Sequence, residues 1–256
     1  MPFQELSIIH SPQTTVHMYD FLERERLLIG EEKLAKLKAC RIFVVGVGGV
    51  GSWAAELLVR AGIGKIVIMD MDEVKASNAN RQIHAMLSNV GKTKTDVMAA
   101  RLLDINPDLE LEAIPEHLEA ASVDKYLDAL QPDCVVDAID EKQPKLALLK
   151  ACVEKKIPVV SSMGAGNKLK PELVKVADIS KSYGCPLARS IRKNLHKLGI
   201  KKGIQVVFSP EEMPEGSVLG EAEDESARRP VGSISFMPAI FGVYCASEAV
   251  NLVLQR

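Results

Sequence analysis

The hydrophobic pattern alternates between short apolar runs and longer helix-forming segments. Residues 41–46 form a β-branched run that closes on a glycine, which is typical of a strand buried on both faces of a sheet. A helix-forming stretch follows at 52–61, Gly62 and Gly64 end it, and a second apolar strand is expected at 65–70. This succession of strand, helix and strand predicts a parallel sheet with crossover helices.

The same alternation continues along the chain. Helices are expected at 92–104 and 123–130, and strands at 110–114, 133–137 and 158–161. Strands that alternate with helices at this spacing favour the α/β class. We therefore predict a Rossmann-like, mainly parallel sheet flanked by helices, with a C-terminal extension that completes the sheet.

Length and local composition suggest one domain with distinct segments. The 256 residues suffice for a large buried core, and we expect residues 1–256 to form a single domain. Its segments are N-terminal helices (18–40, with an amphipathic helix at 18–37), a core (41–163), a basic segment (164–208), a mobile acidic loop (209–230) and a C-terminal strand and helix (231–256). The basic segment carries ten Lys and Arg against two acids, whereas 209–225 carries seven acids and no basic residue.

Composition limits the class of protein and its expected location in the cell. Apolar residues make up 47% and charged residues 26%, which is typical of a folded globular protein, and the net charge of −2 gives no overall bias toward nucleic acid or membrane. Five scattered cysteines argue against a disulfide framework and against a zinc site of paired cysteines, and favour a reducing, cytoplasmic location. No signal peptide is expected, and the apolar stretch 231–254 contains enough polar residues to predict a buried helix rather than a membrane span.

A glycine-rich motif follows the first strand. Gly46, Gly48, Gly49 and Gly51 lie where this strand meets the next helix, so that the backbone can approach a phosphate and the helix N-terminus can supply free N–H donors. Asp70 ends the second strand about twenty residues later, placed to accept ribose hydroxyls. These features predict a nucleotide site but do not separate NAD from ATP.

Cations beyond the second strand favour a nucleoside triphosphate. Asn78, Arg81, Gln82 and Lys94 place two positive charges and several amides near the expected phosphates. Attack at an α-phosphate builds charge on that centre and on the departing pyrophosphate, and Arg and Lys stabilise this charge. A dinucleotide does not need such a pair of cations.

Two carboxylates follow the strand at 133–137. Asp137 and Asp140 are expected at the carboxyl edge of the sheet, where ligands of α/β proteins bind. Mg²⁺ can be held there against phosphates with mostly water ligands. Asp140 is therefore the metal candidate.

Together these motifs resemble the ThiF/MoeB superfamily of adenylating enzymes, which are related to ubiquitin-activating enzymes. The resemblance is carried by residues 46–52, 70–72, 77–78, 80–82, Lys94 and 137–140. It implies that ATP is bound by Gly46, Gly48, Gly49, Gly51, Asp70, Asp72, Asn78, Arg81, Gln82, Lys94 and Asp137. Arg81 and Lys94 would then promote adenylation, with Mg²⁺ held by Asp140.

The superfamily resemblance also implies a two-fold homodimer. In this family an N-terminal arginine reaches the ATP phosphates of the partner subunit, which adds a fourth catalytic candidate. Arg24 is the closest match, with Arg26 as the alternative. An apolar helical stripe and an arginine with no obvious partner in its own chain support the dimer independently.

Within the superfamily, the chain resembles the TcdA/CsdL branch, the tRNA threonylcarbamoyladenosine dehydratases. The resemblance runs from about residue 19 to 254 and includes the stretches 80–84, 89–91, 137–145, 185–189 and 232–238. It implies an ATP-dependent cyclisation, in which the carboxylate of threonylcarbamoyladenosine is adenylated and the carbamoyl group then displaces AMP. It also implies tRNA as a partner, together with a cysteine desulfurase or sulfur-acceptor system.

Three other functions stay open at this point. An adenylyltransferase would activate the C-terminus of a sulfur-carrier or ubiquitin-like protein, and the missing Cys-x-x-Cys pairs disfavour it. An NAD-dependent dehydrogenase is disfavoured by Arg81 and Lys94. A nucleotide-binding scaffold without turnover is disfavoured because Arg81, Lys94 and Asp140 are all intact.

The basic segment supplies candidates for tRNA contacts, since such binding draws on Lys and Arg near phosphates. They are Lys168, Arg189, Arg192, Lys193 and Lys197. A solvated amphipathic helix is the alternative explanation of this charge. We expect Cys185 to be structural and His84 to be a packed, neutral side chain.

Overall fold

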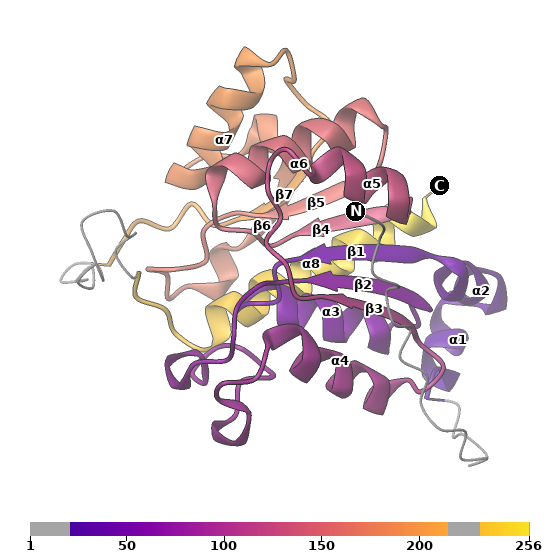
Figure 1. Cartoon of the computed structure of the whole chain (residues 1–256). Coiled ribbons are helices and arrows are strands. Elements are labelled where there is room, and N and C mark those ends of the chain that lie inside the picture. The colour runs from indigo at the N-terminus through magenta and orange to yellow at the C-terminus, as the bar shows by residue number, and fades with distance from the viewer. Residues whose placement is uncertain (1–20, 215–230, 256) are drawn as a thin grey trace.

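A mainly parallel sheet forms the centre of the molecule (Figure 1). The structure, a computed structural model, describes residues 21–214 and 231–255. The strand order in the sheet is β3-β2-β1-β4-β5-β7-β6. Every neighbouring pair is parallel except the last one, in which β6 runs antiparallel to β7. They are β1 (Arg41–Val45), β2 (Lys65–Met69), β3 (Glu110–Ile114), β4 (Cys134–Asp137), β5 (Val159–Ser162), β6 (Lys175–Asp178) and β7 (Gln205–Phe208). The predicted α/β class is confirmed.

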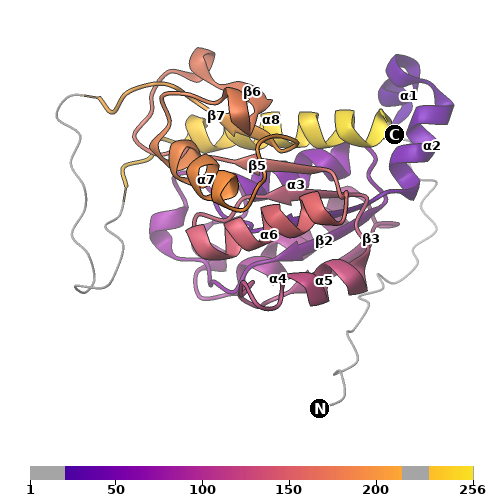
Figure 2. The same ribbon diagram turned by 90° about the horizontal axis from the view of Figure 1, so that it is seen from above.

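Helices cover both faces of this sheet (Figure 2). Ile42 and Val44 of β1 pack toward α3, α4 and α8, whereas Phe43 and Val45 pack toward α5, α6 and α7. Alternate residues therefore meet apolar cores on opposite faces, as in a strand buried on both sides. The helices are α1 (Glu23–Ile29), α2 (Glu31–Ala39), α3 (Gly51–Arg60), α4 (Lys94–Ile105), α5 (Val123–Leu130), α6 (Lys142–Glu154), α7 (Pro186–Lys197) and α8 (Phe236–Leu254).

Most predicted elements lie where the pattern placed them. β3 and α5 have the predicted bounds, and β1, β2, β4, β5, α3 and α4 differ from them by at most two residues. The single helix expected at 18–37 is wrong over the described residues, because Gly30 adopts a φ of +84° and separates α1 from α2. Helix α6, which crosses from β4 to β5, had no counterpart in the prediction.

An extension beyond β5 completes the sheet, but it is not made by residues 231–256. β7 and β6, both within the basic segment 164–208, are the added strands. The strand expected at 231–256 is absent from the described residues there, because the backbone before α8 bonds to loops: Gly232 O accepts from Asn167 N at 2.8 Å and Ser233 O from Asn80 Nδ2 at 3.1 Å. Most of the predicted acidic loop, 215–230, lies outside the described residues.

Helix α8 belongs to the core. Among the described helices it is the one long and apolar enough to cross a membrane. It packs along α3, β4 and β5, however, and Phe241 and Cys245 are fully buried. Gly242 permits this close approach, since a Cβ added there would lie 2.6 Å from Cβ of Trp53.

Candidate nucleotide-binding site

The carboxyl edge of the sheet opens into a cavity of about 630 Å³. Its walls come from the loops that follow the first five strands and from the beginnings of α7 and α8. Ten of the predicted residues line it: Gly46, Gly48, Gly49, Asp70, Asp72, Asn78, Arg81, Gln82, Lys94 and Asp140. Lining residues that sequence reasoning missed include Glu116, His117, Ser162, Gly164, Val231 and Ser233. The cavity lies between β1 and β4, where the strand order reverses, which is the usual ligand site of open α/β sheets.

The glycine loop between β1 and α3 can approach a ligand closely because side chains are missing there. A Cβ on Gly51 would lie 1.7 Å from the carbonyl oxygen of Gly46, and Gly46 has a φ of +86°. Gly51 thus does not line the cavity but lets the loop fold back on itself. Gly48 and Gly49 face the cavity, and the first turn of α3 starts beside them, with N–H groups that can bind an anion.

Asp70 joins the glycine loop to the end of β2. Its carboxylate accepts hydrogen bonds from Val47 N at 2.8 Å and from Asp72 N at 2.9 Å. Lys94 Nζ lies 2.6 Å from a carboxylate oxygen of Asp72 and 3.7 Å from one of Asp70. Two carboxylates therefore hold the Lys94 ammonium at the cavity. The residue is only 5% exposed to solvent.

Arg81, Asn78 and Gln82 form the neighbouring wall. Arg81 Nη1 donates to Ser77 O at 2.9 Å and to Asn80 Oδ1 at 2.8 Å, which directs the guanidinium along this wall. Asn78 Oδ1 accepts from Lys75 N at 3.0 Å. The side-chain oxygen of Gln82 is buried and has no hydrogen-bond partner among the described residues, so a bound ligand could satisfy it.

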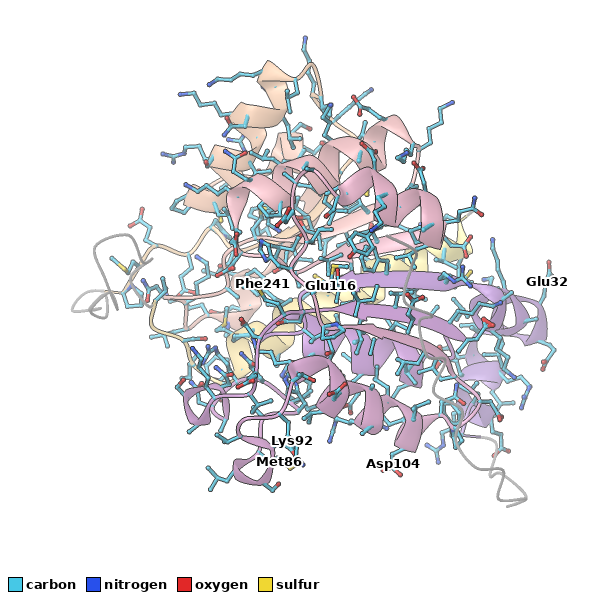
Figure 3. The ribbon with its side chains drawn as sticks, viewed as in Figure 1. Glu32, Met86, Lys92, Asp104, Glu116 and Phe241 are labelled. Carbon is cyan, nitrogen blue, oxygen red and sulfur yellow. The ribbon has the colours of Figure 1, made fainter. Side chains whose placement is uncertain are left out.

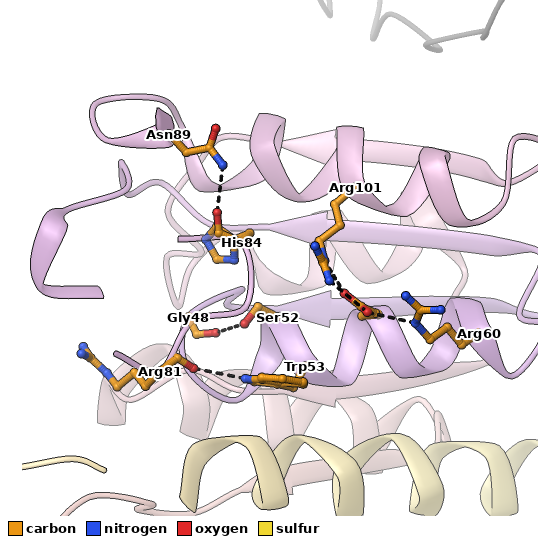
Figure 4. A network of polar contacts seen from close by, with 9 residues as sticks. Gly48, Ser52, Trp53, Arg60, Arg81, His84, Asn89 and Arg101 are labelled. Carbon is orange, nitrogen blue, oxygen red and sulfur yellow. Dashed lines mark hydrogen bonds and ion pairs between the residues drawn. The ribbon is translucent and has the colours of Figure 1, made fainter. Parts of the chain in front are cut away.

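An ion-pair network around the buried Glu56 links α3 to α4 (Figure 4). Glu56 of α3 accepts hydrogen bonds from Arg101 of α4 and from Arg60, the latter at 2.9 Å. Burial opposes ionisation of Glu56, but these two arginines outweigh it and lower the pKa of its carboxyl. Because α3 begins at the glycine loop and α4 begins at Lys94, this network connects the helix after the glycine loop to the helix that carries Lys94.

The structure corrects the role predicted for Asp137. Its side chain is fully buried below the cavity and does not line it. One carboxylate oxygen binds Lys145 Nζ and Ser161 Oγ, each at 2.6 Å, and the other accepts from Ile139 N at 3.1 Å. Sequence reasoning missed this pairing, because Lys145 comes from the first turn of α6, which was not predicted.

The N-terminal arginines lie away from the cavity of their own chain. α1 and α2 precede β1 and pack at the amino edge of the sheet, opposite the cavity (Figure 1). Arg24 is exposed there, and Arg26 Nε binds Glu31 at 2.5 Å. Any action of Arg24 on a nucleotide therefore requires a second protomer.

The five predicted tRNA contacts separate into two groups. Arg189, Lys193 and Lys197 are exposed at successive four-residue intervals and lie on one face of α7, whose nitrogen-tipped side chains project outward in Figure 3. Arg192 turns inward, and its Nη1 donates to Ser182 O at 2.6 Å. Lys168 is only 7% exposed and donates to Glu211 O at 2.8 Å, so it is a structural residue rather than a surface contact.

His84 and Cys185 are both buried, as predicted. Burial, together with the positive charges of Lys94 and Arg101, lowers the pKa of His84 to about 4, so the ring is neutral. Cys185 is 3% exposed. Among the described residues, no three His, Cys, Asp or Glu side chains come together as a metal-binding group.

Comparisons with known proteins agree with this geometry. The ThiF family model matches residues 22–256. The tRNA threonylcarbamoyladenosine dehydratase of Bacillus subtilis is 42% identical over 239 residues, covering 91% of this chain and 94% of the relative, and that of Escherichia coli is 37% identical over 246 residues, covering 90% and 91%. The solved E. coli dehydratase TcdA in complex with ATP superposes with a TM-score of 0.84 at 35% identity, covering 94% of this chain and 98% of that one. The predicted resemblance is thereby confirmed, and the chain belongs to the ThiF family.

Proposed function

We propose that this protein is an ATP-dependent tRNA threonylcarbamoyladenosine dehydratase, an adenylate-forming cyclase. One observation carries the proposal: a single cavity joins a glycine loop and the cations Arg81 and Lys94 to Leu187 at the start of the basic helix α7. ATP and an RNA bound on α7 would therefore meet at one edge of the sheet. The full-length similarity to dehydratases of this name supports the same substrate.

The site fits ATP through its own residues. The Gly48–Gly49 backbone and the first turn of α3 would bind phosphate oxygens, and Asp70 would accept the ribose hydroxyls. Arg81 and Lys94 would stabilise the charge on the α-phosphate and on pyrophosphate as they separate. Asp72 would act through Lys94, whose ammonium it holds at 2.6 Å.

Mg²⁺ can be bound here by a single protein carboxylate, with water and phosphate oxygens as its other ligands. Asp140 lines the same cavity. Asp140 is the residue we propose as its protein ligand. The bound ion would supply positive charge beside the phosphates.

The reaction needs no enzyme nucleophile. A carboxylate oxygen of threonylcarbamoyladenosine attacks the α-phosphorus of ATP, and the bond to the β-phosphate breaks as pyrophosphate leaves. The carbamoyl oxygen then attacks the activated carboxyl carbon, the bond to AMP breaks, and the nitrogen loses its proton. The nucleoside has then lost the elements of one water, and the buried Cys185 takes no part.

The proposed setting includes tRNA, a second protomer and the cytoplasm. Arg189, Lys193 and Lys197 would bind tRNA phosphates through the exposed face of α7. Leu27 and Leu28 on α1 are each 81% exposed, which suits an interface that carries Arg24 to the partner's cavity. Five buried free thiols suit a reducing compartment, and a cysteine desulfurase system stays a predicted partner.

The decisive experiment measures AMP and pyrophosphate release from ATP and Mg²⁺ with unmodified tRNA and with tRNA that carries threonylcarbamoyladenosine. The proposal predicts release only with the modified tRNA, together with loss of one water from the nucleoside by mass analysis. AMP release that requires a carrier protein instead of tRNA would indicate an adenylyltransferase. Replacing Arg189, Lys193 and Lys197 by Ala should weaken tRNA binding and make its salt dependence less steep.

A further inference from the structure

Tyr183 is an exposed aromatic residue within the basic segment. The whole residue is 52% exposed to solvent, and it lies three residues before the first turn of α7. The surrounding segment 164–208 carries ten basic residues against two acids. Surfaces that bind unpaired nucleotides combine exposed aromatic rings with basic side chains in this way.

The Tyr183 ring is held in place from behind. The next residue, Gly184, adopts a φ of +71° and packs against the backbone that follows β7, since a Cβ there would lie 2.5 Å from Cα of Pro210. The ring also meets Phe208 edge to face, with centroids 5.7 Å apart and an interplanar angle of 73°. A ring fixed in this way loses little conformational entropy when a ligand stacks on it.

A cation lies at the hydroxyl end of the ring rather than across its face. Lys175 Nζ is 2.6 Å from the Tyr183 hydroxyl and 5.2 Å from the ring centroid. Both distances hold together only if the ammonium lies beyond the hydroxyl, close to the ring plane. Lys175 therefore covers neither face of the ring. Because Tyr183 is 52% exposed, a base can reach the ring, with a positive charge beside it for the phosphate of the same nucleotide.

The platform formed by Tyr183 and Lys175 lies at the same sheet edge as the nucleotide cavity. Phe208 ends β7, and its neighbour Val207 pairs with Ser162 of β5, a residue of the cavity wall. Lys175 is paired with Phe208 across β6 and β7. Since adjacent strands lie ~4.8 Å apart, the platform is on the order of 10 Å from this wall, within reach of the nucleotides that flank one bound in the cavity.

The geometry points to Tyr183 and Lys175 as a stacking platform for the unpaired tRNA base next to the modified adenosine. This inference rests on the proposed function, because it takes that adenosine to enter the cavity. Stacking on Tyr183 would hold the anticodon loop of the tRNA open while Lys175 binds its backbone phosphate. The platform would thus position the substrate, and it takes no part in the adenylation itself.

The test measures binding of a fluorescent anticodon stem-loop that carries threonylcarbamoyladenosine to the full-length protein. Stacking is worth ~1–3 kcal/mol per base, so Tyr183→Ala should raise Kd about 5- to 150-fold. Tyr183→Phe keeps the ring and should stay within about twofold of the wild type. Leu198→Ala is the matched control, since Leu198 is 51% exposed in the same segment and has no ring.

A second set of RNAs separates stacking from general structure. In these RNAs the base on one or the other side of the modified adenosine is removed. At one of the two positions, the removal should weaken wild-type binding as much as Tyr183→Ala does. The same removal should not weaken binding by the Tyr183→Ala protein any further. Fully additive losses at both positions, unchanged binding by Tyr183→Ala, or equal losses in Tyr183→Phe would overturn the platform. In turnover, the KM for tRNA should rise and the KM for ATP should not.

Failure of the platform and failure of the proposed function give different results. If the wild type forms no AMP with modified tRNA, the dehydratase function fails, and the binding series still tests the platform. If the wild type does not bind the stem-loop, the platform is refuted. If AMP forms normally and Tyr183→Ala binds and turns over as the wild type does, only the platform is refuted.

Discussion

Replacing Lys145 by Met should destabilise the protein strongly, because it leaves the Asp137 carboxylate buried without its cation. Both side chains are 0% exposed, and their charged atoms lie 2.6 Å apart. Removing one partner of a buried ion pair costs ~3–5 kcal/mol. Asp137 keeps hydrogen bonds from Ser161 Oγ and Ile139 N, so we expect the lower end, about 3 kcal/mol.

The free energy of unfolding, measured by urea titration, tests this value. The double variant Asp137→Asn with Lys145→Met removes both charges and should recover at least ~1 kcal/mol relative to Lys145→Met alone. Lys150→Met is the control on the same helix: its exposed pair with Glu154 spans 3.6 Å, so its loss should stay within ~0.5 kcal/mol. A loss below ~1 kcal/mol in Lys145→Met, or a double variant no more stable than it, would refute this account of the pair.

Three further predictions concern the nucleotide site and its support. Arg81→Ala and Lys94→Ala should each abolish AMP formation with an unchanged circular dichroism spectrum; near wild-type turnover would exclude the phosphate roles. Gly51→Ala should abolish ATP binding by calorimetry and lower Tm, since its Cβ would lie 1.7 Å from a backbone oxygen. The pKa of His84 is about 4 in the folded protein and 6.5 in the unfolded chain. As the pH falls from 6.5 to 4, the unfolded chain therefore takes up a proton at His84 that the folded protein does not. Protonation at His84 alone should therefore lower the free energy of unfolding by ~3 kcal/mol from pH 7 to pH 4, and urea titrations of His84→Leu should lack this part of the pH dependence.

The strands and the glycine loop were predictable because their signals are local. β-Branched runs that end in glycine or aspartate mark buried parallel strands, and the residues after them must meet at one edge of the sheet. This reasoning placed Asp70, Arg81 and Lys94 in one cavity, as observed. It also located α3, which follows the glycine loop, and α4, which carries Lys94, to within two positions.

The errors concern partners that are distant or belong to unpredicted elements. Asp137 and Asp140 differ little by sequence position, but only Asp137 has Lys145 beneath it. Lys168 was assigned to RNA by charge, whereas its ammonium binds the backbone of Glu211, 43 residues away. Periodicity reports which face of an element is apolar, and it does not report which side chain from another element meets a given charge.

The packing of α8 has a consequence for how the protein is made. During synthesis, β4 and β5 leave the ribosome well before α8, so the part of their apolar face that α8 covers, which includes Val160, stays exposed until that helix arrives. The same late segment brings Ser233 and Pro238 to the cavity. A nascent chain is therefore exposed to aggregation between the synthesis of β5 and that of α8, and it acquires the complete cavity only when its last described helix has docked.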